Sequence, residues 1–446
     1  MSTPSLERDA TTIRQAAREI SSARNTYDAL VDLAGDADLV LIGEATHGTQ
    51  EFYAIRAELT RRLIAEKGFR AVSIEGDWPD TFRVHRYVTG RGDDTSAAEA
   101  LGGFQRFPSW MWRNTVVVEF VEWLRHWNER ASDGHGLTGF YGMDLYSMHT
   151  SIESVLRYLE KVDPQAAQRA RCRYACFEHF STEPQEYGRA TVRQGREPCE
   201  DEVVSQLVEL RQKQAMLIHC NGRLAREDFF SAEQNARLVM NAERYYRSMF
   251  YGRDESWNLR DTHMFETLEE LRMHLGNGRG RIVVWAHNSH LGDARATEMG
   301  KRGELNVGQL VRSRSGDRSF SIGFSTYSGS VTAANDWGGP AQRKDVRPGM
   351  PGSYEELFHA TGLPRFWLNL QESNEATRLL EEPRLQRAIG VIYRPQTERW
   401  SHYFHASMPR QFSAVIHLDE THALTPLERD SRWDVGEYPE TYPSAL

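Results

Sequence analysis

The segment Gly43-Glu44-Ala45-Thr46-His47-Gly48 places a carboxylate and an imidazole three residues apart, directly after the apolar run LVLI. A histidine near its ordinary pKa can take a proton from water at neutral pH, and a carboxylate can fix the tautomer that does so. The same two side chains can also serve as metal ligands or simply shape a polar turn. The choice among these interpretations depends on which other residues reach the same place.

Polar residues also stand at the ends of three other apolar runs. In an open α/β sheet the carboxyl ends of parallel strands meet at one crevice, where ligands bind. We therefore expect these residues to share one pocket with Glu44 and His47. They are Glu75 and Asp77 in FRAVSIEGD, Asp144 in LTGFYGMD, and His287 and His290 in RIVVWAHNSH.

The elements that would position these residues are short and apolar. Runs at 38–44, 69–77, 137–144, 281–290 and 320–329 have the length of strands, and helical patterns separate most of them. This alternation predicts buried strands of a largely parallel α/β sheet. Three later runs lie closer together and are expected to complete the sheet with some antiparallel pairing at its edge. They are RFWLNL, AIGVIY and FSAVIHLD.

Residues 150–278 contain no convincing strand but carry amphipathic patterns such as SIESVLRYLEKV. An insertion of this length is expected to form its own helical layer rather than a loop. We expect a lid-like helical subdomain at 150–278 over one edge or mouth of the sheet. Residues 1–149 and 279–446 would then form the α/β catalytic core.

This set of side chains suits hydrolysis by activated water. His47 would take the proton, and Arg56, two turns into the helix that follows, would stabilise a tetrahedral oxyanion. The sequence has no G-x-S-x-G elbow, and Ser289 and Ser328 lack its glycine frame. The pattern favours water over a serine as the nucleophile.

Two other interpretations stay open. The pairs Glu44/His47 and His287/His290 supply four N and O donors, enough for Zn, Mn or Fe in a metal-dependent hydrolase or peptidase. However, the H-E-x-x-H signature is absent, and such pairs converge reliably only on a helix. The third interpretation is a protein that binds iron, haem or a small metabolite without turnover.

Two further segments are candidates for substrate contacts. The loop GGFQRFPSWMWRN at 102–114 is rich in aromatic residues, and Trp110 and Trp112 are its candidates for lining a pocket. The segment ESWNLRDTHM places Arg260, Asp261 and His263 in the helical insertion. Those three residues are expected to be either lid contacts or an ion-pair patch on the surface.

Composition narrows the class of ligand. The 446 residues are 39% hydrophobic and 26% charged, as in a soluble globular protein. The net charge of -9 argues against nucleic acid or anionic membrane as a partner, so we expect a small-molecule ligand that is neutral or cationic. Four cysteines do not form a disulfide scaffold, and no export signal or long apolar run is seen, so a reducing cytoplasm is expected.

Taken in chain order, these motifs resemble the erythromycin esterase-like family, some members of which are macrolide resistance enzymes. GEATHG together with AHNSH is the specific combination. The resemblance extends from about residue 10 to residue 425. The motifs that carry it are LIGEATHGTQEFYAIRAELTRRLI, VSIEGDWPD, FYGMDLYS, NAERYYRSMFYGRDESWNLRDTHM, WAHNSHLGDAR, GELNVGQL and RPQTERWSHYF.

The resemblance implies an α/β/α sheet core with an inserted helical subdomain. It also implies hydrolysis of a cyclic ester, such as a macrolactone, by a histidine-activated water without a required metal or other cofactor. Transferred to this sequence, the family's site consists of His47 as general base, Glu44 as its orienting partner, Arg56 and Glu75, and His287 and His290 holding water and substrate.

Overall fold

The computed structural model describes residues 4–23, 25–130, 136–178, 180, 184–218, 222–276 and 278–428. Its centre is a nine-stranded sheet in which β11, β6, β2, β5, β3 and β4 run parallel in that order. β8 and β1 extend one edge antiparallel, and β7 pairs antiparallel with β6. The strands are β1 (Arg18–Glu19), β2 (Leu39–Ile42), β3 (Ala71–Asp77), β4 (Gly139–Asp144), β5 (Ile282–Trp285), β6 (Ser319–Ala333), β7 (Gln342–Val346), β8 (Arg365–Asn369) and β11 (Ala414–Thr421).

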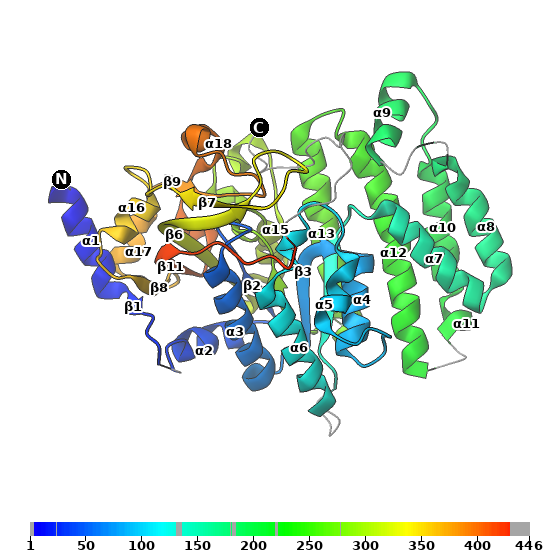
Figure 1. Cartoon of the computed structure of the whole chain (residues 1–446), viewed down its shortest axis with the longest axis horizontal. Coiled ribbons are helices and arrows are strands. Elements are labelled where there is room, and N and C mark those ends of the chain that lie inside the picture. Colours follow the sequence, from blue (N-terminus) through cyan, green and yellow to red (C-terminus); the bar gives the residue numbers. More distant parts are fainter. Residues whose placement is uncertain are drawn as a thin grey trace.

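Helices cover both faces of this sheet (Figure 1). Successive strand residues point to opposite faces, so Val40 and Ile42 of β2 pack in one apolar cluster and Leu39 and Leu41 pack in another. The first cluster includes α2 (Asp28–Gly35), α3 (Gln50–Lys67) and α6 (Thr115–Arg130), and the second includes α13 (Arg253–Gly276) and α15 (Val307–Ser315). The core is therefore the three-layer α/β/α sandwich that the sequence predicts, with a mixed edge.

A group of helices between β4 and β5 lies at one end of the molecule, around the long α12 (Figure 1). Its last helix, α13, packs directly on β4 and α15, so it also belongs to a layer of the core. A disulfide joins Cys176 and Cys199 in this group, a pair that the cysteine spacing did not predict. The other helices of this group are α7 (Met148–Val162), α8 (Pro164–Tyr174), α9 (Pro184–Gln194), α10 (Glu200–Gln212), α11 (Gln214–Ile218) and α12 (Gly222–Ser248).

Shorter helices complete the chain. Among the described residues, none of the helices combines the length and the apolar character needed to cross a bilayer. The helices not yet given are α1 (Pro4–Ala16), α4 (Trp78–Val88), α5 (Ala97–Ala100), α14 (Asn288–Leu291), α16 (Tyr354–His359), α17 (Glu375–Leu380), α18 (Glu398–Ser401) and α19 (Met408–Gln411).

The prediction that AIGVIY is a strand of the sheet is wrong. The chain forms β9 (Arg384–Arg387), which pairs with β10 (Tyr403–Ala406) in a separate ribbon, and residues 388–393 make only isolated bridges. Their backbone bonds go to a loop instead, because Ile389 N–H donates to Ala45 O at 2.9 Å and His47 N–H donates to Ile389 O at 3.3 Å. This apolar segment therefore packs against the GEATHG loop.

Candidate active site

The GEATHG loop connects β2 to α3 and holds the first pair of site residues. Both glycines of the loop are needed for close approach: a Cβ on Gly43 would lie 2.2 Å from Asn288 Oδ1, and one on Gly48 would lie 1.9 Å from Thr332 O. His47 Nδ1 lies 2.8 Å from Glu44 Oε1. Because a carboxylate only accepts, Nδ1 carries the proton and the Nε2 lone pair is left to act as a base.

Arg56 lies behind this pair rather than in front of it. Its Nη1 is 3.2 Å from Glu44 Oε2, and its guanidinium packs over the rings of Tyr53 and Trp285 at 4.3 and 4.8 Å. Arg56 is completely buried. Its guanidinium therefore pairs with the Glu44 carboxylate, and because Arg56 does not line the cavity it is not placed to stabilise an oxyanion there.

His287 follows β5 and faces His47, with 4.7 Å between the ring centroids. The Ser289 N–H donates to His287 Nδ1 at 3.2 Å, so Nδ1 is unprotonated and Nε2 carries the hydrogen. Burial and the neighbouring His47 lower the pKa of His287 well below its ordinary value. His287 is therefore a neutral imidazole beside the base.

Arg260 gathers the carboxylates at the ends of β3 and β4. It forms two parallel bonds to Asp144, at 2.9 and 2.6 Å, and a third to Glu75 Oε1 at 2.9 Å. The other oxygen of Glu75 accepts the His287 backbone N–H at 2.9 Å. Burial alone would raise the pKa of Glu75, but His290 and Arg260 hold it well below its ordinary value.

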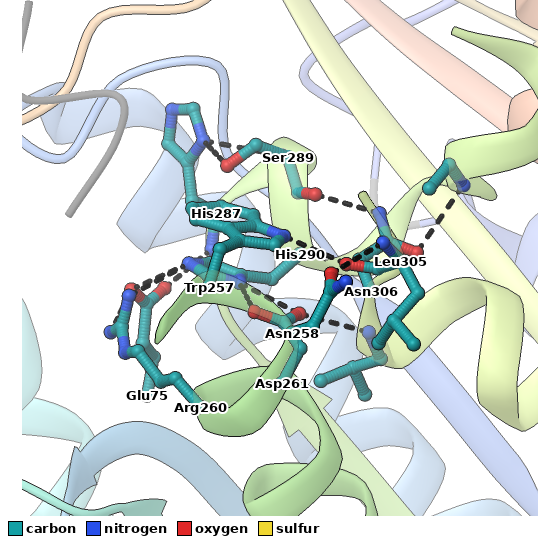
Figure 2. Close-up of polar contacts among 12 residues, drawn as sticks. Glu75, Trp257, Asn258, Arg260, Asp261, His287, Ser289, His290, Leu305 and Asn306 are labelled. Carbon is teal, nitrogen blue, oxygen red and sulfur yellow. Dashed lines mark hydrogen bonds and ion pairs between the residues drawn. The ribbon is translucent and has the colours of Figure 1, made fainter. Parts of the chain in front are cut away.

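His290 is enclosed by α13 (Figure 2). Trp257 stacks on its ring at 4.5 Å, and its Nδ1 lies 3.0 Å from both oxygens of Asp261. Burial alone would lower the pKa of His290, but Asp261 and Glu75 raise it to about 9. Burial raises the pKa of Asp261, while His290, Arg260 and the Val307 N–H oppose that rise. We assign the pair as carboxylate and imidazolium because both Asp261 oxygens face Nδ1.

A cavity of about 110 Å³ opens at these side chains. His47, Glu75, Asp144 and Arg260 lie in its wall, and aromatic side chains such as Trp112 complete it. A second, larger cavity of about 1070 Å³ lies between α4, α7 and α12. Three residues line both cavities: Asp80, Arg106 and Tyr146.

Two further carboxylates face the small cavity. Asp77 accepts the Ser147 hydroxyl at 2.6 Å and the Tyr146 N–H at 2.8 Å. Burial and the neighbouring charge of Asp77 raise the pKa of Asp80 to about 8. Asp80 is therefore mostly protonated at neutral pH.

The strand-end residues that the sequence singles out lie together in the structure, but two predicted residues from other segments do not line the cavity. Arg56 lies behind Glu44, and Trp110 is buried in the core beside α6 without lining either cavity, whereas Trp112 lines the small one and donates to Glu75 O at 3.1 Å. The surface ion-pair alternative for Arg260, Asp261 and His263 is wrong, because all three are buried. Other wall residues, Phe104, Arg106 and Phe107, come from the same aromatic loop at 102–114, whereas no sequence pattern pointed to Tyr146, Trp337 and Val391.

The donors of the proposed metal alternative already have partners among neighbouring side chains. His47 Nδ1 is bound to Glu44, and both nitrogens of His290 face carboxylates. Over the residues that the structure describes, no group of three or more His, Cys, Asp or Glu side chains is placed to hold a metal ion.

The raised pKa of His290 predicts a pH-dependent stability. A histidine at 6.5 when unfolded and about 9 when folded stabilises the fold fully below pH 6.5, and that stabilisation is lost as the pH rises through 9. The loss should be on the order of 3 kcal/mol. Urea unfolding of the wild type and of His290→Gln over this pH range measures the loss. Asp80, whose pKa is raised to about 8, contributes to both curves, so their difference reports His290 alone. Parallel pH curves for the two proteins would contradict the prediction.

Comparison with known proteins shows the family of the chain. The erythromycin esterase family profile matches residues 64–421, a range that begins after the GEATHG loop. YbfO of Bacillus subtilis (strain 168), a hydrolase by name, is 21% identical over 87% of this chain and 84% of its own. The erythromycin esterase type II of Escherichia coli is 23% identical over 69% of this chain and 73% of its own.

Solved structures share the fold. A crystal structure described as a succinoglycan biosynthesis protein has a TM-score of 0.76 at 18% identity and covers 95% of this chain and 100% of its own. An erythromycin esterase mutant in its open conformation has a TM-score of 0.65 at 15% identity, covering 95% and 98%. Because the family profile matches most of its length, the chain belongs to the erythromycin esterase family.

Proposed function

We propose that the protein hydrolyses a carboxylic ester with a water molecule that His47 activates. The observation that carries this proposal is the Glu44–His47 pair, which leaves the Nε2 lone pair of His47 at the wall of a cavity. Family membership supports a hydrolase, and the name of the Escherichia coli relative supports an ester as the substrate.

In the proposed reaction His47 takes one proton from water and later gives it to the leaving alcohol. His47 Nε2 takes a proton from water while the water oxygen bonds to the acyl carbon. The tetrahedral intermediate then breaks its bond to the alcohol oxygen, which receives the proton from the His47 imidazolium. The products are an alcohol and a carboxylic acid, which releases its proton to the solvent and becomes a carboxylate. Arg106 supplies positive charge at the cavity wall, where we place the oxyanion.

The two cavities suggest how a large substrate would bind. The cavity beside His47 holds about 110 Å³, below the roughly 300 to 1,000 Å³ of most ligand pockets. The neighbouring cavity of about 1070 Å³ shares three wall residues with it. We infer that the ester group enters the small cavity while the body of the substrate, a macrolactone for instance, lies in the larger one.

A panel of esters tests the proposed function. Linear esters and macrolides of different ring size are incubated with the purified protein, with and without EDTA, and the products are examined by mass spectrometry. We expect at least one ester to gain one water, with the same rate in EDTA. Loss of activity in EDTA would favour the metal-dependent alternative. Haem binding without hydrolysis of any ester would favour a binding protein.

Glu44→Gln should lower kcat about 100-fold with little change in KM. The amide cannot stabilise the imidazolium, and Arg56 loses its counter-charge. Steady-state kinetics on the ester found above measure the effect. Glu298→Gln is the matched control, because Glu298 pairs with His405 on the surface and should be silent. A Glu44→Gln enzyme with wild-type kcat would show that the pair is structural.

A further inference from the structure

The first turns of α13 are fastened to the loop at 303–307 (Figure 2). Trp257 Nε1 donates to Leu305 O at 2.7 Å, and Asn258 bonds both Gly303 O and Leu305 N–H, at 3.0 and 2.8 Å. Asp261 Oδ1 accepts the Val307 N–H at 3.0 Å. These bonds fix the side chains of α13 that face the loop after β5.

Asp261 and Trp257 use this position to enclose His290. The indole covers one face of the imidazole with an interplanar angle of 9°, and both carboxylate oxygens of Asp261 face Nδ1 at 3.0 Å. Asp261 is fully buried and His290 is 1% exposed. Water therefore cannot readily replace Asp261 as the partner of Nδ1.

The other ring nitrogen meets two groups of opposite charge. His290 Nε2 lies 3.3 Å from Glu75 Oε1 and 3.1 Å from Arg260 Nη1. A protonated Nε2 donates to Glu75, whereas an unprotonated one accepts from Arg260. Glu75 and Asp144 pair with Arg260 and Asp261 pairs with His290, so this buried cluster holds three carboxylates against one cation unless His290 is also charged. This balance favours the imidazolium.

We propose that Asp261 is a positioning residue of the hydrolytic site, which keeps His290 as an imidazolium against Glu75 and so fixes Glu75 between the His287 backbone and Arg260. Asp261 does not line the cavity, so it acts only through His290 and Glu75. The inference rests on the proposed function for its kinetic consequence. The charge of His290 is a separate property that needs no substrate.

Asp261→Asn tests the proposal because it keeps the shape and an oxygen for the Val307 N–H but removes the charge. Protonation of His290 is followed by NMR of protein labelled with ¹⁵N-histidine, over a pH titration. We expect both ring nitrogens of wild-type His290 to carry protons at neutral pH. In Asp261→Asn the pKa should fall to or below its ordinary 6.5. His47 and His287, which also lie near Glu75, are assigned in the same spectra.

Kinetics then separate positioning from folding. Asp261→Asn should lower kcat at least about tenfold with KM unchanged, and Asp261→Glu should restore part of it. Asp419→Asn is the matched control: Asp419 also pairs with a histidine, His359, at 2.7 Å, but this pair lies outside the site, so the titration of His290 and kcat should stay unchanged.

Three results would overturn the proposal. They are a neutral His290 in the wild type, an imidazolium that persists in Asp261→Asn, and a kcat that does not respond when the charge is lost. If the wild type hydrolyses no ester, the proposed function fails, and the NMR titration alone still decides whether Asp261 holds His290 charged.

Discussion

Replacing His47 by Asn should lower kcat for ester hydrolysis by about 10³- to 10⁴-fold. His47 is the proposed proton acceptor. Its Nδ1 is already bound to Glu44 at 2.8 Å, which leaves Nε2 to take the proton. Asn is small enough to fit the site but has no basic nitrogen. The fold should survive, so the circular dichroism spectrum and Tm should stay close to those of the wild type.

His405→Asn is the matched control for this substitution. His405 also pairs with a glutamate, with Nδ1 at 3.2 Å from Glu298 Oε2, but both side chains lie at the surface. It should retain wild-type turnover. Hydrolysis by a folded His47→Asn enzyme at a rate near that of the wild type would show that another group activates the water.

Replacing Arg260 by Met should have the largest effect on stability. The substitution leaves Glu75 and Asp144 buried with one cation fewer, and breaking a buried pair in this way typically costs about 3 to 5 kcal/mol. The free energy of unfolding in urea measures the loss. Turnover should also fall, because Glu75 is no longer held against the His287 backbone.

Arg237→Met provides the comparison for this prediction. Arg237 is as buried as Arg260, but its partner Glu266 is half exposed, so water can solvate the carboxylate once the arginine is gone. Its cost should be clearly smaller. Equal losses of free energy in the two variants would mean that Arg260 contributes by packing rather than by neutralising the carboxylates.

The sheet was predictable because its parallel strands are short apolar runs separated by helical patterns. For β2 and β5 the runs LVLI and IVVW are buried on both faces, which is why they do not alternate with polar residues. Because ligand-binding residues of such sheets follow the carboxyl ends of the parallel strands, Glu44, Glu75 and His290 were expected at that edge of the sheet, and the structure places them there.

Contacts that depend on packing between distant segments were not predictable. AIGVIY has the composition of a strand, yet its backbone partners are loop residues such as Ala45, and no local pattern specifies them. Asp261 and Trp257 lie on α13, and the spacing of apolar residues along this helix does not predict which of its turns contacts the loop after β5. Trp110 and Trp112 differ in role because the 3₁₀ turn at Ser109–Met111 directs one side chain to the core and the other to the cavity.

Hydrolysis in ¹⁸O-labelled water tests the central claim most directly. An ester that the wild type cleaves is incubated in the labelled solvent, and both products are analysed by mass spectrometry together with the intact protein. If water activated by His47 attacks the acyl carbon, one ¹⁸O enters the carboxylate, none enters the alcohol, and the protein carries no acyl adduct. Label in the alcohol, or an acyl group on the protein, would contradict this mechanism.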